Sequence, residues 1–325
     1  MNVSIVIPVF NEADGLSSFY DTLRSALDHT NLGIEIIFVD DGSCDNSAVV
    51  LTGFTKDDPR VQVIQLRRNY GQTAAMMAGI RQATGDVIVS MDADGQNDAN
   101  DIPRLLEKLA EGFDVVSGWR QPREDKALTR RLPSVIANRL ISRLMHVSLH
   151  DYGCTLKAYR REVLEDVRLY GEMHRFIPIF AAWEGACVAE LPVRHHARQF
   201  GQSKYGLGRI IRVLLDLLIL VFIDRVMDRP MQFFGKLGLA VLVTSVLVFL
   251  WAVALRFEGV SLIQTPLPLL AATLGLSGVL FLLLGIMSEI LMRTYYEAQG
   301  KTPYKIRSIF GQAATPAPLV PIDQR

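Results

Sequence analysis

The sequence has no excess charge of either sign and no pattern of paired cysteines. Its 34 Lys and Arg residues balance its 34 Asp and Glu residues over 325 positions, so no overall field draws the chain to nucleic acid, and we expect no nucleic-acid partner. The three cysteines, Cys44, Cys154 and Cys187, stand far apart and form no CxxC pair. An odd number of cysteines without metal-ligand spacing is typical of free thiols in a reducing compartment.

The N-terminus also lacks the features of a secretory signal. The opening residues, MNVSIVIPVFNE, contain no basic stretch, no long apolar run and no small-residue cleavage site. Together with the free thiols, this predicts that the first part of the chain stays in the cytoplasm.

Charged residues make up only 21% of the chain, and hydrophobic residues make up 50%, whereas a typical soluble domain is about 25% charged. The apolar surplus lies mainly between residues 213 and 291. Two charge-free stretches, 237–255 and 267–288, match the roughly 20 residues that are needed to cross a bilayer. We therefore predict two transmembrane helices; the alternative is a very apolar helical hairpin buried in a protein core.

Basic residues flank these two stretches unevenly. The connector between them, 256–266, holds only Arg256, whereas several basic residues lie outside the pair: Arg225, Arg229, Lys236, Arg293, Lys301, Lys305 and Arg307. The positive-inside rule then places both ends of the chain and the first domain in the cytoplasm, with the spans in the cytoplasmic (inner) membrane.

The predicted organisation has four parts. Residues 1–204 form a soluble domain. Residues 205–230 form an amphipathic region, because charges recur there among apolar residues, as in a helix that lies in the membrane interface. Residues 231–293 hold the two spans, and the Ala- and Pro-rich tail, 294–325, is predicted to be partly disordered.

Short β-branched runs alternate with helical patterns through the first domain. Residues 3–10, 34–39, 61–66 and 86–91 read as buried strands, and residues 13–29 and 73–83 read as helices. This alternation predicts an α/β fold of Rossmann-like type, with a mostly parallel sheet covered on both faces. Ligands of such sheets bind at the carboxyl ends of the strands.

The fourth predicted strand ends in MDADGQND. Asp92 and Asp94 are two residues apart, so in an extended segment both side chains leave the same face. Their carboxylates repel each other unless a cation neutralises them, and hard oxygen ligands suit Mg²⁺ or Mn²⁺. Gln96 adds a neutral oxygen to this predicted metal site. The alternative is an ordinary acidic surface turn.

Polar residues also end the first two predicted strands. Asp40 and Asp41 follow the second strand, where a carboxylate can accept hydrogen bonds from a nucleobase or a ribose. The alternative is that this segment caps the next helix through Ser43 or Asp45. Glu12, after the first strand, has the same two interpretations.

Four motifs in order, SIVIPVFNE, IIFVDDGSCDNS, RRNYGQTAAMMAGI and TGDVIVSMDADGQND, resemble the family-two glycosyltransferases of GT-A fold over residues 1–230. The two predicted spans narrow the resemblance to the polyprenyl-phosphate glycosyltransferases. RNYGQ, DYGCTLKAYRR, FIP and QFGQSKY are particularly similar to the members of that family that transfer 4-deoxy-4-formamido-L-arabinose to undecaprenyl phosphate. Gly95 departs from the leucine of many relatives, which bears only on the stiffness of its loop.

The resemblance implies a role for each matching residue. The nucleotide and donor site would comprise Pro8, Val9, Asn11, Glu12, Asp40, Asp41, Gly71, Gln72, Asp92 and Gly118. The metal ligands would be Asp92, Asp94 and Gln96. Catalysis would involve Asp94, Arg120 beside the donor sugar, and Asp151 on the acceptor side. Arg198, Ser203 and Lys204 would hold the phosphate of the acceptor. Arg130 and Arg131, which are adjacent to each other in the sequence, are further candidates for this role; the alternative is that they are ordinary solvated surface.

The implied acceptor is a phosphate monoester on a lipid, which is mostly a dianion at pH 7. Such a nucleophile needs positioning more than a general base, so Asp151 is expected to orient the acceptor or to stabilise charge on the sugar. The sequence offers no clear enzyme nucleophile, which favours single displacement with inversion. The resemblance further implies a UDP-sugar donor, an undecaprenyl phosphate acceptor and a homo-oligomer, as in the tetrameric relatives.

Two other functions remain open. A processive polysaccharide synthase shares the Asp-x-Asp domain, but it carries a QxxRW-like motif and more spans than two. A nucleotide-binding scaffold or transport protein is expected to place polar groups along its spans, and few are present here: Thr244, Ser245, Thr273, Ser277 and, near one end, Glu289.

Overall fold

A computed structural model of the chain describes residues 1–28, 30, 32–121, 141–143, 145, 147–165, 167, 173–196, 217, 219–222, 226 and 230–298. The chain divides into two compact units, Met1–Arg225 and Val226–Arg325. Most of the predicted amphipathic region and most of the predicted tail lie outside the described residues.

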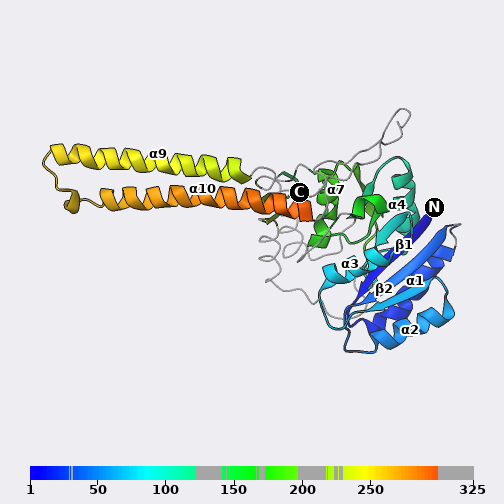
Figure 1. Cartoon of the computed structure of the whole chain (residues 1–325). Helices are drawn as coiled ribbons and strands as arrows, with labels where there is room; N and C mark the ends of the chain where they lie inside the picture. The colour runs from blue at the N-terminus through cyan, green and yellow to red at the C-terminus, as the bar shows by residue number, and fades with distance from the viewer. Residues whose placement is uncertain are drawn as a thin grey trace, which may run out of the picture. The chain divides into compact units, whose positions relative to one another are not determined.

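The first unit is built on one seven-stranded sheet of the described residues, in the order β3-β2-β1-β4-β6-β5-β7; Figure 1 labels β1 and β2 of this sheet. Its strands are β1 (Asn2–Val9), β2 (Gly33–Asp40), β3 (Val61–Gln65), β4 (Val87–Ser90), β5 (Val115–Arg120), β6 (Lys157–Arg160) and β7 (Val188–Val193). All neighbouring pairs are parallel except those of β6, which runs antiparallel to β4 and β5. The predicted α/β fold with a mostly parallel sheet is therefore confirmed.

Alternate residues of β1 divide the core into two layers, because successive side chains of a strand point to opposite faces. Val3, Ile5, Ile7 and Val9 pack against the helices α1 (Ala13–Asp28), α2 (Ser47–Asp57) and α4 (Ile102–Ala110). Val6 packs on the other face with α3 (Gln72–Gln82), α6 (Arg161–Leu164) and α7 (Ile177–Trp183). Both faces of the sheet are thus covered, which explains why β1 reads as a continuous apolar run.

Helix α3 lies unusually close to the sheet. A Cβ atom on Gly79 would lie 2.4 Å from Cγ1 of Val6, so only glycine permits this approach. The unit also contains the short helices η1 (Ala99–Asp101) and η3 (Met173–Phe176). The close packing of α3 matters for function because its N-terminus lies at the carboxyl edge of the sheet.

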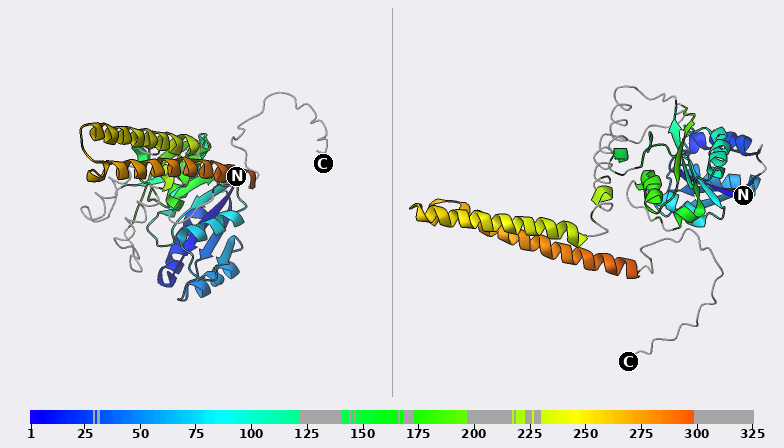
Figure 2. Two further views of the ribbon diagram at one scale, coloured as in Figure 1. Left: turned by 60° about the vertical axis from the view of Figure 1, so that its left-hand side comes forward. Right: turned by 90° about the horizontal axis from the view of Figure 1, so that it is seen from above.

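The second unit is a pair of long apolar helices, α9 (Pro230–Phe257) and α10 (Leu267–Ala298), which run side by side in every view (Figures 1 and 2). η5 (Leu262–Gln264) lies in their connection. The helices approach closely at Gly238 and Gly278: a Cβ atom on Gly238 would lie 2.8 Å from the carbonyl oxygen of Gly278. Small residues at such a contact are typical of helices that pair in a membrane.

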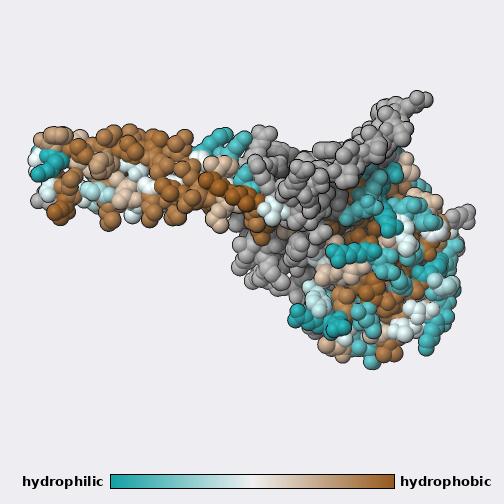
Figure 3. Space-filling view, viewed as in Figure 1, coloured by the Kyte–Doolittle hydropathy of each residue, from teal (hydrophilic) through white to brown (hydrophobic). Residues whose placement is uncertain are grey.

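Both helices are long and apolar enough to cross a membrane, and they contain the two predicted spans. Only 11% and 17% of the residues in their most apolar windows are buried, and their outer surface is largely hydrophobic (Figure 3). A hairpin buried in a protein core would instead be mostly covered. The structure therefore favours the membrane interpretation over a core hairpin.

The three cysteines differ in accessibility, and this generates a prediction. Cys44 and Cys187 are exposed, whereas Cys154 is buried; burial, helped by the charge of Asp151, raises the pKa of the Cys154 thiol to about 12. Because only the thiolate reacts readily, we expect N-ethylmaleimide to modify two thiols of the folded protein and all three after denaturation. Intact-mass analysis measures the number of adducts. A third adduct on the folded protein, or any adduct on a folded variant carrying Cys44→Ser and Cys187→Ser, would contradict the fold around Cys154.

Candidate active site

The predicted site residues converge on the edge of the sheet where the parallel strands end. Asp40 is the last residue of β2, and Arg120 is the last residue of β5. Asp92 follows β4 by two residues, and β4 neighbours β1, which leads into Asn11 and Glu12. Helix α3 starts at the same edge with Gln72. Side chains that are far apart in the sequence therefore share one region, as expected for ligand sites of open α/β sheets.

Asn11 joins the loops that follow β1 and β2. Its backbone adopts a left-handed conformation with φ of 52°. Its amide donates a hydrogen bond to Oγ of Ser43 over 2.9 Å, and its side-chain Oδ1 accepts one from the amide of Cys44 over 2.7 Å. The next amide, that of Glu12, donates to Oγ of Ser47. Asn11 thus sets the relative position of the two loops that flank Asp40.

The capping alternative for this segment is wrong for Ser43, whose hydroxyl accepts from the Asn11 amide instead. Helix α2 begins at Ser47, and Asn46 at its N-cap makes no side-chain capping bond. Asp45 does serve the start of this helix, because its Oδ1 accepts from the amide of Ser47 over 2.9 Å. Its Oδ2 accepts from the amide of Ala13, the first residue of α1.

Asp40 and Asp41 are both buried but make different contacts. Oδ1 of Asp40 accepts from the amide of Ser43, and no described residue donates to its other oxygen. Asp41 uses both oxygens: they accept from the amides of Tyr70 and Gly71 over 2.7 and 2.8 Å. Burial raises the pKa of Asp41, against the lowering effect of these two amides. Asp41 therefore fastens the loop after β3, and Asp40 retains an acceptor atom for a ligand.

The loops after β2 and β3 also touch backbone to backbone. Gly42 has a φ of 69°, and a Cβ atom there would lie 2.4 Å from the carbonyl carbon of Arg68. Only glycine satisfies both the left-handed backbone and the lack of space. The loop that leads to Gly71 and Gln72 is thus set by Gly42 as well as by Asp41.

The pair Asp92 and Asp94 carries unbalanced negative charge. Burial, then the charge of Asp94, raise the pKa of Asp92 to about 7, although the hydroxyl of Thr155 and the charges of Arg175 and Arg120 act in the opposite direction. Nε2 of Gln72 donates to Oδ1 of Asp92 over 2.6 Å. This hydrogen bond from the side-chain amide of Gln72 shows that α3 contacts Asp92 directly.

The loop around Asp94 fits a divalent cation by its chemistry. Oδ1 of Asp94 accepts from the amide of Gln96, which turns the loop back on itself, and all three predicted ligands offer oxygen atoms of the kind that Mg²⁺ and Mn²⁺ prefer. Among the described residues, no three His, Cys, Asp or Glu side chains gather as a closed metal site. A cation held by this open set would take its other ligands from outside the described residues.

Arg120 and Asp151 form a bidentate ion pair. Nε of Arg120 lies 2.6 Å from Oδ2 of Asp151, and Nη2 lies 2.9 Å from Oδ1. The Asp151 side chain is 1% exposed and the Arg120 side chain 19%. Two parallel hydrogen bonds between a guanidinium and a carboxylate are strong and fix the geometry of both groups. Sequence reasoning named both residues separately; their pairing is a finding of the structure.

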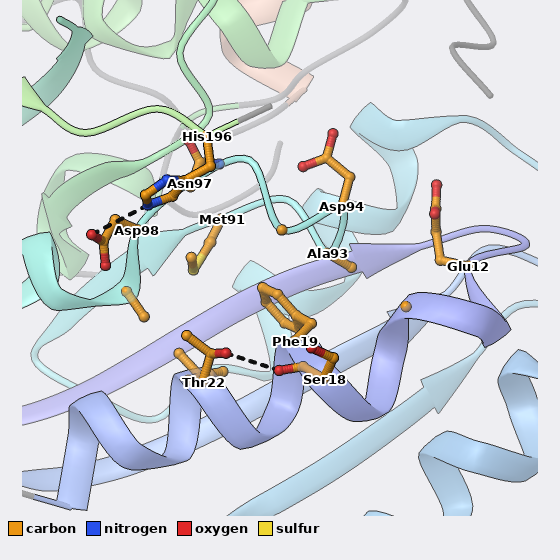
Figure 4. Close-up of a pocket in the computed structure, with 14 residues that line it drawn as sticks. Glu12, Ser18, Phe19, Thr22, Met91, Ala93, Asp94, Asn97, Asp98 and His196 are labelled. Carbon is orange, nitrogen blue, oxygen red and sulfur yellow. Dashed lines mark hydrogen bonds and ion pairs between the residues drawn. The ribbon is translucent and has the colours of Figure 1, made fainter. Parts of the chain in front are cut away.

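A cavity of about 200 Å³ lies between α1 and the loop after β4 (Figure 4). Phe19, Leu23 and Met91 contribute apolar side chains to it. Glu12 and Asp94 are the members of the predicted site that line it, and in Figure 4 their carboxylates point the same way, away from α1. The cavity thus adjoins one predicted metal ligand, Asp94.

Comparison with known proteins agrees with this geometry. The sequence model of the family described as "Glycosyl transferase family 2" matches residues 4–168. A dodecaprenyl-phosphate galacturonate synthase from Rhizobium johnstonii is 40% identical over 95% of this chain and 93% of its own. The chain belongs to glycosyl transferase family 2. An undecaprenyl-phosphate 4-deoxy-4-formamido-L-arabinose transferase from Pseudomonas fluorescens is 38% identical over 99% of this chain and 94% of its own.

Solved structures confirm the GT-A fold of this glycosyltransferase. Glucosyl-3-phosphoglycerate synthase from Mycobacterium tuberculosis, in complex with Mn²⁺ and UDP-glucose, matches with a TM-score of 0.53 and 19% identity, covering 68% of this chain and 78% of that one. Its complex with Mg²⁺ and UDP matches with a TM-score of 0.52 and 18% identity, covering 68% and 79%.

Three predicted donor-site residues of the glycosyltransferase, Pro8, Val9 and Gly118, contribute to the structure of the sheet. Val9 is buried in the core and pairs with Asp40, and Pro8 pairs with Val39; the side chain of Val9 therefore packs inward. Gly118 is buried where β5 meets the next strand, and a Cβ atom on it would lie 2.7 Å from the carbonyl oxygen of Leu156. The close contact between strands accounts for this glycine.

Sequence reasoning missed two cationic residues of the glycosyltransferase that lie near the carboxylates. Lys157 is only 2% exposed, and burial lowers the pKa of its amine to about 8. Its Nζ donates to the carbonyl oxygens of Tyr152 and Arg175, and Arg175 acts electrostatically on Asp92. A lysine inside the otherwise apolar segment LKAY, residues 156–159, was the available signal, since a buried lysine needs partners.

The predicted phosphate-binding residues lie outside the described residues. These are Arg130, Arg131, Arg198, Ser203 and Lys204. Their contacts to an acceptor stay predictions from the sequence.

The contacts of Asp41 generate a prediction. In an Asp41→Asn variant, one acceptor oxygen becomes an NH₂ group that faces a backbone N–H, and hydrogen bonds to a charged group are worth about 1.5–3 kcal/mol each. The loop that carries Gly71 and Gln72 should loosen, so we expect the KM for a nucleotide-sugar to rise about tenfold, equivalent to about 1.4 kcal/mol. Steady-state kinetics measure this change. The exposed Asp21→Asn exchange on α1 serves as control, and an unchanged KM in folded Asp41→Asn protein would refute the role.

Proposed function

We propose that this family 2 glycosyltransferase moves a sugar from a nucleotide-sugar to a polyprenyl phosphate at the cytoplasmic face of the membrane. The observation that carries the proposal is the meeting of Asp92, Asp94 and the Arg120–Asp151 pair at one sheet edge, in a chain with two long apolar helices. The relatives that match nearly the whole chain carry dodecaprenyl phosphate or undecaprenyl phosphate in their names, which supports a lipid phosphate as acceptor.

The donor nucleotide would lie against the loops after β1, β2 and β3. Asp40 would accept a hydrogen bond from the base through its remaining oxygen, and Asp41 would keep Gly71 and Gln72 in place beside the ribose and diphosphate. We propose a UDP-sugar, on the family resemblance of the sequence motifs. Asp92, Asp94 and Gln96 would hold Mg²⁺ or Mn²⁺, which supplies charge neutralisation for the leaving diphosphate.

The transfer itself would be one displacement. An oxygen of the lipid phosphate forms a bond to the anomeric carbon while the bond from that carbon to the donor diphosphate breaks, and the nucleoside diphosphate leaves. The acceptor needs no base because it is mostly a dianion at neutral pH. Asp151, already paired with Arg120, would orient this guanidinium toward the charges of donor and acceptor rather than remove a proton. Direct attack predicts inversion at the anomeric carbon.

The second unit would hold the reaction beside its lipid substrate. The two apolar helices provide the membrane anchor, and the basic residues around them favour a cytoplasmic active site. Two helices do not enclose a channel, which argues against a processive polysaccharide synthase. A nucleotide-binding scaffold or transport protein would place polar groups along its spans, and the few such residues in the two apolar stretches argue against it.

A donor screen tests this function directly. Purified protein, undecaprenyl phosphate, Mg²⁺ or Mn²⁺ and radiolabelled nucleotide-sugars are expected to yield butanol-extractable label with a single sugar per lipid, and excess EDTA is expected to abolish it. NMR of the product reports inversion. Polymeric product would indicate a processive synthase, and no consumption of any nucleotide-sugar would indicate a non-catalytic protein.

Removing one predicted metal ligand gives a sharper test. Asp94→Asn keeps the shape of the side chain but removes its charge, so we expect kcat to fall by about two to three orders of magnitude, the effect of losing about 3–4 kcal/mol of charge stabilisation. The exposed Asp57→Asn exchange on α2 should leave kcat within about twofold. Equal activity of wild type and folded Asp94→Asn protein would rule out this metal site.

A further inference from the structure

The carboxylate of Glu190 on β7 (Val188–Val193) accepts hydrogen bonds from the backbone around Asp151. Oε1 of Glu190 accepts hydrogen bonds from the amides of His150 and Asp151 over 2.9 and 3.0 Å. Oε2 accepts from the His150 amide over 3.0 Å, and Nδ1 of the His150 ring lies 2.8 Å away from it. The Glu190 side chain is only 12% exposed. Two consecutive residues thus depend on one partly buried anion for their orientation.

The sheet fixes where this anion lies. β7 pairs in parallel with β5, with Glu190 opposite Ser117 and Val193 opposite Arg120. Glu190 and Arg120 therefore sit on neighbouring strands of one rigid sheet. The segment with His150 and Asp151 lies between β5 and β6 in the sequence. It is held to β7 by hydrogen bonds to the charged carboxylate of Glu190, and such bonds are stronger than those between neutral groups.

The same segment has two further attachments to β5. The His150 ring stacks on Trp119 with ring centroids 4.3 Å apart and an interplanar angle of 15°. The next residue of β5, Arg120, holds the carboxylate of Asp151 through two contacts. Backbone and side chain of Asp151 are thereby fixed from different strands: the backbone by Glu190, and the carboxylate by Arg120.

We infer that Glu190 is a positioning residue of the glycosyltransferase, which orients Asp151 so that Asp151 in turn holds Arg120 in the geometry for sugar transfer. This inference rests on the proposed function for its effect on catalysis. A misplacement of about 1 Å in such a constellation is enough to reduce turnover by about 100-fold. Glu190 lies on β7 and not on the loops after β1, β2 and β3, against which the donor nucleotide would lie, so its effect should fall on turnover more than on donor binding.

Kinetics of Glu190→Gln test the inference. The amide keeps the size of the side chain, but it presents an NH₂ group where the carboxylate accepted hydrogen bonds. We expect kcat to fall by about 10- to 100-fold, up to the loss that such misplacement causes, with donor KM within about twofold. Glu162→Gln, an exchange of the same chemistry on the exposed side of α6, should change neither. A kcat of Glu190→Gln equal to that of Glu162→Gln would overturn the inference.

A double-mutant cycle separates positioning from general stabilisation. If Glu190 acts through Asp151, then Glu190→Gln should cost less than about twofold in kcat when Asp151→Asn is already present, because coupled residues are not additive. An equal cost in both backgrounds would show that Glu190 contributes only to stability and would overturn the inference. If Glu190→Gln does not fold, the same cycle is run with Glu190→Asp, which keeps the charge but shortens its reach.

Hydrogen exchange tests the contact without any turnover. In the peptide that covers residues 147–153, Glu190→Gln should speed exchange of the amides of His150 and Asp151 about tenfold, and Glu162→Gln should leave it unchanged. Unchanged exchange in Glu190→Gln would overturn the inference. If the wild type transfers no sugar, the proposed function fails, while faster exchange in this peptide would still support the hold of Glu190 on Asp151.

Discussion

Repulsion among carboxylates at one edge of the sheet is the constraint on which this site depends. Parallel strands deliver Asp40, Asp41, Asp92 and Asp94 to the same edge, and Asp151 lies there as well through its pair with Arg120. Isolated buried carboxylates are strongly disfavoured. The structure meets this cost differently at each position: backbone amides hold Asp41, a guanidinium holds Asp151, and an amide side chain contacts Asp92.

The negative charge that these contacts leave unbalanced indicates which ligand the site binds. The pKa of Asp92 is still raised by burial and by the charge of Asp94. A divalent cation bound at this pair would therefore relieve the repulsion between the two carboxylates. Among the described residues, the Lys157 amine is held by two carbonyl oxygens, and the charges of Arg175 and Arg120 lower the pKa of Asp92 only in part. The described cations thus offset the charge of the acidic pair only in part, which suits a metal bound together with a diphosphate.

The elements around the pair depend on close approaches at glycines as well as on side-chain hydrogen bonds. Gly42 lets the loops after β2 and β3 touch, and Gly79 brings α3 against β1. Because Gln72 is the first residue of α3, the depth of this helix decides whether its amide reaches Asp92. The second unit follows the same rule: Gly238 and Gly278 set the separation of α9 and α10.

The local pattern of the sequence was enough for several elements. β-Branched runs predicted β1 to β4, and charge-free stretches predicted the cores of α9 and α10, because burial and periodicity are local signals. β5, β6 and β7 were not predicted. β6 in particular is short and antiparallel to both neighbours, so the regular alternation of strand and helix that marks the first four strands fails there.

For the site, the acidic residues at the strand ends could be identified from the sequence alone. Two carboxylates in an Asp-x-Asp motif after a buried strand already suggest a site for a divalent cation. Which carboxylates stay available was decided only by the tertiary structure. Asp40 and Asp41 are neighbours of one type, yet one is tied to a loop 30 residues away and the other keeps an acceptor atom. The pairing of Arg120 with Asp151, and the hold of Glu190 on residues 150–151, join segments that are 31 to 40 residues apart. Such contacts depend on how strands are ordered in the sheet, and no local pattern encodes that order.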